Sequence, residues 1–233
     1  QENPIQEWTA LDRACVKNPC VMVDGVRHAP LQLTDIRAIG CDFYLFSLYK
    51  VYSVHQGLMI IKADRARELP NQGHFFNEGL PHYRLTPAGP DHAQVAASRG
   101  VLEYIQATDR HHGGDGTLRN AVQRVNHLWR THEHDILTPL LTYLKNSPKA
   151  RLIGSDRNQG RNPTVSIELG KPGAVCEKLG THNIMAGHGH FYALRLIKAL
   201  GIDPDDGVLR ISLVHYNTSA DVDKICTVLD NVL

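Results

Sequence analysis

The sequence predicts an α/β protein on two grounds. Short apolar runs alternate with segments of helical periodicity along most of its 233 residues. Two of these runs also end on chemically active side chains. Residues 21–23 lead into Asp24, and residues 43–46 lead into Ser47 and Lys50. Ligands of α/β sheets bind at the carboxyl ends of the strands, so the sequence predicts a binding site there.

The amino-terminal half is expected to hold several elements. Apolar spacing predicts a helix over 5–16, which Asn18-Pro19 ends. Strands are expected at 21–23 and 43–46, with a short helix at 34–40 between them. The run 57–62 reads as a buried strand whose glycine marks a close backbone approach. Residues 70–90, rich in proline and glycine, are predicted to form a loop.

The second half continues the alternation. Asp91 is expected to cap a helix reaching about 108, and a long helix over 117–145 should kink or break at Pro139. Predicted strands are 151–153, 164–169, 183–185 and 208–213, and predicted helices are 171–179, 191–200 and 219–232. Ser219 is expected to cap the last helix, with Asp221 in its first turn. We therefore expect two domains, 1–148 and 149–233.

Composition excludes several classes of protein. With 42% hydrophobic and 21% charged residues, the chain has enough apolar surface for a folded core. The net charge is +1 without a long basic run, which argues against nucleic-acid binding. Five cysteines without paired spacing indicate a reduced, cytoplasmic protein, and no apolar run is long enough for a membrane span.

A carboxylate and an amine at neighbouring strand ends indicate a pyridoxal phosphate site. In such sites the lysine forms a Schiff base with the cofactor, and the carboxylate keeps the pyridinium nitrogen protonated. The simpler readings are a solvated lysine at Lys50 and an ordinary turn aspartate at Asp24 before Gly25.

Three separated blocks carry a family resemblance. They read VDGVRHAP, DIRAIGCDFYLFSLYKVY and, near the carboxyl end, RISLVHYNTSADVDKI. In this order they resemble the class V aminotransferase and cysteine desulfurase family, with wording nearest its cysteine desulfurase-like members. The resemblance implies a fold-type-I pyridoxal phosphate enzyme. The chain would be the carboxyl-terminal part of its three-layer αβα large domain, followed by a small α/β domain.

The resemblance also implies residue roles. Lys50 matches the Schiff-base lysine and Asp24 the partner of the pyridinium nitrogen. Ser47 and Tyr49 fall where the family binds phosphate, although tyrosine replaces a histidine and carries no positive charge. Arg27 stands where many members have glutamine beside the phenolic oxygen. It would either pair with that oxygen or point to solvent.

The last block implies a substrate. Arg210 matches the arginine that grips the substrate carboxylate, and a guanidinium fork suits a small amino acid. The simpler reading is an edge-strand arginine. The family works as a homodimer and catalyses transamination, elimination, epimerisation or desulfuration at Cα, so the same range of reactions is implied here.

The chain departs from the family pattern in several places, one of which is Pro30-Leu31 where the family has Pro-His. The Y-G-P turn after the lysine becomes Tyr52-Ser53-Val54, and the persulfide loop R-x-G-x-H-C becomes MAGHGH without arginine or cysteine. Sulfur transfer through a persulfide is therefore not expected. The family's amino-terminal phosphate-binding elements also have no counterpart. The alternative to an enzyme is therefore a non-catalytic fragment or pseudoenzyme.

The fourteen histidines offer one competing reading, because pairs such as His132 and His134 could hold a metal. Residues two apart on a helix do not share a face, and no HExxH motif is present. Surface and loop histidines are the expected reading.

Overall fold

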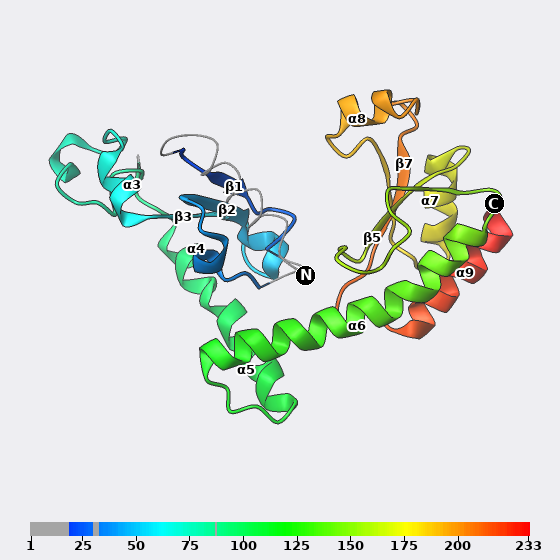
Figure 1. The fold of residues 1–233 in the computed structure, drawn as a ribbon, viewed down its shortest axis with the longest axis horizontal. Helices are drawn as coiled ribbons and strands as arrows, with labels where there is room; N and C mark the ends of the chain where they lie inside the picture. The colour runs from blue at the N-terminus through cyan, green and yellow to red at the C-terminus, as the bar shows by residue number, and fades with distance from the viewer. Residues whose placement is uncertain (1–18, 30–32, 87) are drawn as a thin grey trace. The chain divides into compact units, whose positions relative to one another are not determined.

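The computed structural model describes residues 19–29, 33–86 and 88–233 (Figure 1). The helix predicted over 5–16 lies outside these residues. Two compact units divide between Asn126 and His127, inside the long helix, and each is described by itself. The domain boundary predicted at 148/149 stays a prediction. Among the described residues, no helix has both the length and the apolarity needed to cross a membrane.

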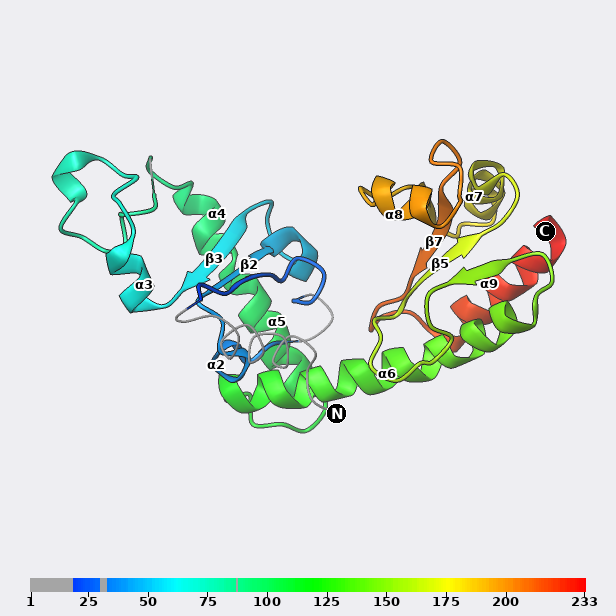
Figure 2. The same ribbon diagram turned by 45° about the horizontal axis from the view of Figure 1, so that its top comes forward.

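The first unit is built on a three-stranded sheet in the order β1-β2-β3 (Figure 2). β1 runs parallel to β2, and β3 is antiparallel to β2. The unit also carries several helices and the first part of α6. Its elements are β1 Met22–Asp24, α2 Ile36–Ile39, β2 Phe43–Ser47, the 3-10 turn η1 Leu48–Val51, β3 Gly57–Ile61, α3 Ala63–Glu68, the 3-10 turn η2 Phe75–Asn77, α4 His92–Ala97, α5 Arg99–His111 and α6 Leu118–Asn146.

Both faces of this sheet carry buried and exposed side chains. Tyr44 of β2 is buried in a cluster that also contains Val21, Ile39, Leu48 and Val51. Because side chains alternate along a strand, Leu45 and Ser47 lie on the opposite face from Tyr44. Their exposure is intermediate.

The prediction of a buried strand at 57–62 was correct for the strand and wrong for its burial. In β3, Leu58, Met59 and Ile60 are 37–40% exposed, although they point alternately to the two faces. A hypothetical Cβ on Gly57 would meet nothing within 4 Å, so this glycine does not mark a close approach. A short apolar run predicts a strand, but it does not say what packs on that strand.

Two buried carboxylates link elements of the first unit. Asp42 accepts a hydrogen bond from the Val21 backbone N–H at 2.9 Å, and Lys62 Nζ lies 3.1 Å from its other oxygen. Asp109 of α5 is gripped by a fork from Arg124 of α6, at 2.6 and 2.7 Å. The Arg124 guanidinium therefore holds the pKa of Asp109 below its usual value.

The helices of this region differ in detail from the predictions. Asp91 caps α4 by accepting from the Gln94 backbone N–H at 3.1 Å, as expected. The predicted single helix from 91 to 108 is divided at Ser98 into α4 and α5. The long helix α6 is confirmed, and it passes through Pro139 without a break. The hydroxyl of Thr138 donates to the His134 carbonyl at 2.9 Å, one residue before the proline.

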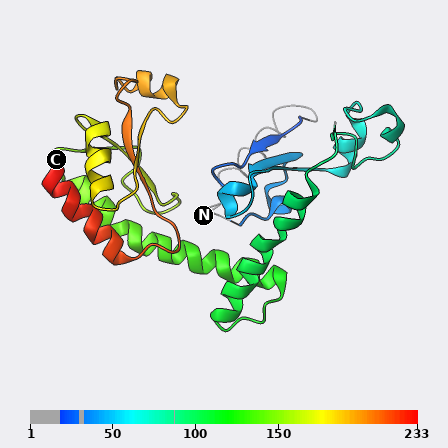
Figure 3. The same cartoon turned by 180° about the vertical axis from the view of Figure 1, so that it is seen from behind.

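The second unit contains a four-stranded antiparallel sheet in the order β4-β5-β7-β6, with helices beside it (Figure 3). Helices α7 and α9 and the carboxyl-terminal half of α6 pack on one face of it around Leu140, Leu179, Leu209 and Leu229, which are fully buried. Its other elements are β4 Arg151–Ile153, β5 Thr164–Glu168, α7 Pro172–Thr181, β6 Gly187–Gly189, α8 Leu194–Ala199, β7 Val208–Ser212 and α9 Ser219–Val232.

Most second-unit elements match the predictions, with three corrections. The strand expected at 183–185 lies at Gly187–Gly189 instead, because Asn183 takes a left-handed conformation (φ 58°) in the turn after α7. The helix expected from 191 begins only at Leu194. The cap of α9 is Thr218 rather than Ser219. Its hydroxyl and Asp221 form a reciprocal capping box.

Candidate functional site

Asp24 stands at the carboxyl end of β1, as predicted. It is paired with Leu45 of β2, and the next residue, Gly25, donates its N–H to the Leu45 carbonyl at 2.7 Å. An Asp24 side-chain oxygen accepts the Val26 backbone N–H at 3.0 Å, which closes the turn. The side chain is exposed. The carboxylate is therefore held at the edge of the sheet where a ligand could meet it.

The Tyr44 side chain packs against the turn that follows Asp24. The hydroxyl of Tyr44 lies 3.0 Å from Nδ1 of His28, which also lies 2.9 Å from the Thr34 hydroxyl. Burial raises the pKa of Tyr44 above its usual value. A Cβ on Gly25 would lie 2.2 Å from the Tyr44 ring, so only glycine fits in this turn. The sequence places Gly25 in a turn, but it does not indicate that Tyr44 packs against this glycine.

Ser47 and Lys50 follow from the end of β2. Ser47 is the last residue of the strand and the cap of η1, but its hydroxyl makes no capping hydrogen bond. Leu48 and Val51 are buried and anchor the 3-10 turn, which leaves Tyr49 exposed and Lys50 partly exposed. Tyr52 ends the turn in a left-handed conformation (φ 68°) and donates its N–H to Leu48. The chain thus completes this turn without the family's Gly-Pro.

The Tyr49 ring contacts the side chains of His55 and Lys50. Its ring stacks on His55 with centroids 4.6 Å apart and planes 7° from parallel. Lys50 Nζ lies 5.7 Å from the Tyr49 ring centroid. His55, in the turn between η1 and β3, was not among the predicted residues. The stack places the His55 imidazole against the residue that stands where the family pattern has histidine.

Strand register places several predicted residues on one face. Asp24 pairs with Leu45 in the parallel ladder, and Ser47 is two residues further along β2. Residues paired in register or two apart on a strand share a face, so Asp24 and Ser47 both lie on the face opposite Tyr44. Lys50 lies in η1, the 3-10 turn that Ser47 precedes. Arg27 is exposed in the turn after Asp24.

This set has the chemistry that pyridoxal phosphate requires. A carboxylate suits the ring nitrogen, a primary amine suits the aldehyde carbon, and hydroxyl groups suit the phosphate. The Ser47 hydroxyl is not used as a helix cap, which fits the same purpose. The residues present in the first unit therefore fit the cofactor.

Arg210 belongs to the second unit and is described within it. It lies in the middle of β7, opposite Ser166 of β5 on one side and Gly187 of β6 on the other. Its Cζ is 3.8 Å from the ring centroid of Phe191. Leu209 and Ile211 are buried in the main core, so Arg210 emerges on the opposite face of the sheet.

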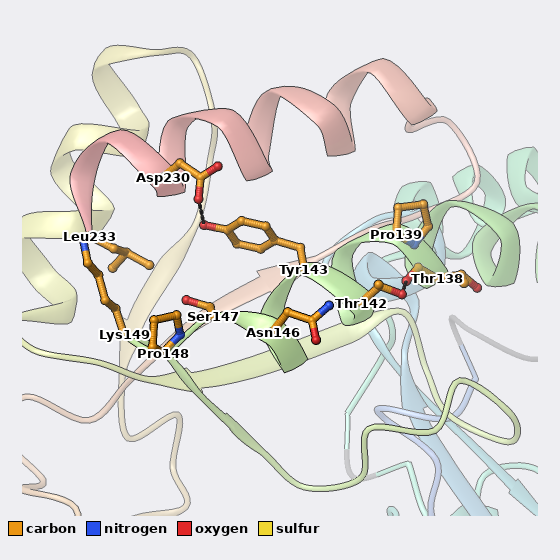
Figure 4. Close-up of a pocket in the computed structure, with 10 residues that line it drawn as sticks. All are labelled: Thr138, Pro139, Thr142, Tyr143, Asn146, Ser147, Pro148, Lys149, Asp230 and Leu233. Carbon is orange, nitrogen blue, oxygen red and sulfur yellow. Dashed lines mark hydrogen bonds between the residues drawn. The ribbon is translucent and has the colours of Figure 1, made fainter.

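A separate hollow of about 700 Å³ lies in the second unit, where the end of α6 meets α9 (Figure 4). The Tyr143 hydroxyl donates to Asp230 there at 2.8 Å, and burial raises the pKa of Tyr143 above its usual value. None of the six predicted site residues lines it. Its walls are Thr138, Pro139, Thr142, Tyr143, Asn146, Ser147, Pro148, Lys149, Asp230 and Leu233.

Comparison with known proteins shows what the chain is similar to. Residues 123–225 match the family model described as aminotransferase class-V. The chain is 35% identical over 217 residues to the aminotransferase-like protein FGM3 of Gibberella zeae, and 25% identical over 248 residues to a cysteine desulfurase of Escherichia coli. The chain is therefore similar to members of the class V aminotransferase and cysteine desulfurase family. The resemblance drawn from its sequence blocks is confirmed.

A solved cysteine desulfurase has a similar fold. The cysteine desulfurase CsdA of Escherichia coli matches with a TM-score of 0.75 and 22% identity over 95% of this chain. The fold-type-I assignment is therefore confirmed. The chain spans about half the length of the relatives it matches, namely 51% of FGM3, 55% of the Escherichia coli desulfurase and 53% of CsdA.

Proposed function

We propose that this chain carries the cofactor lysine of a pyridoxal phosphate enzyme that acts at Cα of a small amino acid. The single observation that carries the proposal is the register of β1 and β2. It sets Asp24 and Ser47 on one face of the sheet at the carboxyl end of two parallel strands, with Lys50 in the turn that follows. Ligands of α/β folds bind at this edge.

The roles of the first-unit residues follow from their chemistry. Bound pyridoxal phosphate supplies an electron sink for the bond that breaks at Cα. Lys50 binds the cofactor through Nζ and, as a free amine, moves the proton at the substrate Cα. Asp24 accepts a hydrogen bond from the ring nitrogen and holds its proton. Ser47 and Tyr49 donate their hydroxyl hydrogens to the phosphate. Arg27 either pairs with the phenolic oxygen or faces solvent.

The second unit supplies substrate recognition in this proposal. Arg210 donates to the substrate carboxylate through the two N–H groups along one edge of its guanidinium. An amino acid is the substrate class that uses both a lysine-bound cofactor and a carboxylate anchor. Since the persulfide loop contains no cysteine, we propose a transfer or elimination reaction rather than persulfide-based desulfuration.

Reductive trapping tests the proposal. Pyridoxal phosphate is added to the purified protein, the imine is reduced with borohydride, and the modified peptide is identified by mass spectrometry. We expect modification at Lys50, its loss in Lys50→Ala, and wild-type labelling in Lys198→Ala, which removes an exposed lysine of α8. Wild-type protein without an adduct, or Lys50→Ala labelled to the same extent, would sink the proposal and favour a non-catalytic fragment.

A second variant separates charge from structure at Asp24. An asparagine at this position would keep a side-chain oxygen for the Val26 N–H, so Asp24→Asn preserves the turn while removing the negative charge. We expect a higher dissociation constant for pyridoxal phosphate in this variant, measured by the absorbance of the bound cofactor. Equal affinities would remove Asp24 from the site. We also propose a homodimer, which sedimentation analysis of the full-length protein tests.

A further inference from the structure

The segment after β6 has an unusual backbone. Gly187 of β6 lies opposite Arg210 of β7, and the chain then reverses, with the Ala193 N–H donating to the His190 carbonyl at 2.8 Å. Within this reversal Phe191 and Tyr192 take φ values of 47° and 63°. Side chains other than glycine rarely adopt this left-handed region, and consecutive aromatic residues there are strained. Such strain persists only where surrounding contacts hold it.

Those contacts hold the Phe191 ring rather than Tyr192. Phe191 packs against the small cluster of Ile197, Ile202 and Val208, whereas Tyr192 is fully exposed. The ring also fills the space above Gly187, where a Cβ would lie 3.3 Å from two ring carbons. The strained backbone therefore has a specific result, which is to fix the Phe191 ring on the face of the sheet that carries Arg210.

The Phe191 ring lies under the Arg210 guanidinium. Cζ is 3.8 Å from the ring centroid, which is face-to-face stacking distance. A guanidinium stacked in this way keeps its N–H groups in a plane parallel to the ring, where they can form a fork with a planar carboxylate. A free arginine side chain would instead sample many rotamers and lose entropy on binding.

We propose that Phe191 is a positioning residue for Arg210, and that the left-handed turn exists to place its ring beneath the guanidinium. The inference rests on the proposed role of Arg210 as the carboxylate anchor. It adds that the orientation of the fork is set by a stacked aromatic side chain from the neighbouring loop. The recognised chemistry is a planar carboxylate approaching the edge of the guanidinium.

Arginine side-chain NMR tests the stacking in the full chain. The Arg210 Nε–H resonance is assigned by its loss in Arg210→Lys. Phe191→Leu keeps an apolar side chain for the cluster but removes the ring, so the resonance should move downfield by losing its ring-current shift. Phe191→Tyr keeps the ring and should retain the wild-type position. An unchanged resonance in Phe191→Leu would overturn the stacking.

Acetate, as the simplest carboxylate, tests the consequence for binding. Titration followed at the same resonance should give a dissociation constant roughly tenfold higher in Phe191→Leu than in the wild type, with recovery in Phe191→Tyr. Equal affinities, or no response of wild-type Arg210 to acetate, would overturn the proposal. This measurement needs no cofactor, so failure of the trapping at Lys50 is distinguished from failure here.

A second perturbation covers the case in which Phe191→Leu loses the fold of the loop. Gly187→Ala leaves Phe191 in the sequence but brings a methyl group against its ring, which must shift by a few tenths of an ångström. We expect the Arg210 resonance to move and acetate affinity to fall. A variant that stays folded with both quantities unchanged would contradict the proposed positioning.

Discussion

Glu133 of α6 is a buried carboxylate whose removal should make the second unit more stable at alkaline pH. The residue is 5% exposed, and the His215 backbone N–H donates to its side chain. Arg130 is the cation that favours its charged form, but burial outweighs this and raises the pKa of Glu133 to about 7. Beside it, the ring of Trp129 stacks on His215 with centroids 4.0 Å apart.

The sign of the effect follows from proton linkage. Between the ordinary glutamate pKa of 4.5 and about 7, the folded protein holds a proton on Glu133 that the unfolded chain releases. Stability therefore falls as the pH rises through this range. A difference of about 2.5 units corresponds to a loss of about 3 kcal/mol at most. Burial and the nearby His132 lower the pKa of His215, so the stability that neutral His215 contributes is lost as the pH falls. The wild type and a variant at Glu133 share this loss.

Glu133→Gln tests this reasoning, because the amide oxygen can still accept from His215 while no charge is buried. We expect the free energy of unfolding to exceed that of the wild type by about 1–3 kcal/mol at pH 8 and to match it closely near pH 5. Urea unfolding is followed by Trp129 fluorescence in a Trp8→Phe background, which leaves Trp129 as the only tryptophan. If the free energies of unfolding of Glu133→Gln and the wild type differ by the same amount at both pH values, the effect does not come from ionisation of a buried carboxylate.

Two further predictions concern stability. Arg124→Ala leaves the buried Asp109 carboxylate without its guanidinium partner and should lower the melting temperature of the first unit. Arg99→Ala removes only an exposed ion pair and should change that temperature little. Similar melting curves for the two variants would contradict a stabilising role for the Arg124–Asp109 pair. Gly207→Ala would place a Cβ 2.2 Å from the backbone of β6. It should lower the free energy of unfolding by more than the roughly 1 kcal/mol expected for Gly201→Ala, where φ is positive but the space is open. Equal losses for the two variants in urea unfolding would mean that backbone strain is the cause, without a contribution from the contact with β6.

The sequence was most informative where chemistry and local structure coincide. The places of Asp24, Ser47 and Lys50 at strand ends could be predicted because an apolar run reveals where a strand ends, and a strand end reveals where its next polar side chain stands. The capped start of α4 at Asp91 and the length of α6 could be predicted for the same reason, since both are encoded by adjacent residues.

Features that depend on distant partners could not be predicted. The position of β6 is set by pairing with β7 and not by its own sequence, which is glycine and histidine without apolar alternation. The stack of Phe191 under Arg210 needs a left-handed backbone that aromatic residues rarely adopt, so no local pattern indicates it. Tyr49 and His55 are only a few residues apart, yet their contact depends on how η1 ends at Tyr52.

The close approach of Tyr44 to Gly25 has a consequence for how this site can vary. Any side chain at position 25 would collide with a phenol ring that is 1% exposed and tied to His28 through its hydroxyl. Neither residue can therefore be replaced alone by a larger one, and substitutions at the two positions must be made together. A library randomised at both should return glycine at 25 wherever tyrosine is kept at 44, and other residues at 25 only beside a small residue at 44. The freedom to diversify around Asp24 is thus governed by a residue on the opposite face of the sheet.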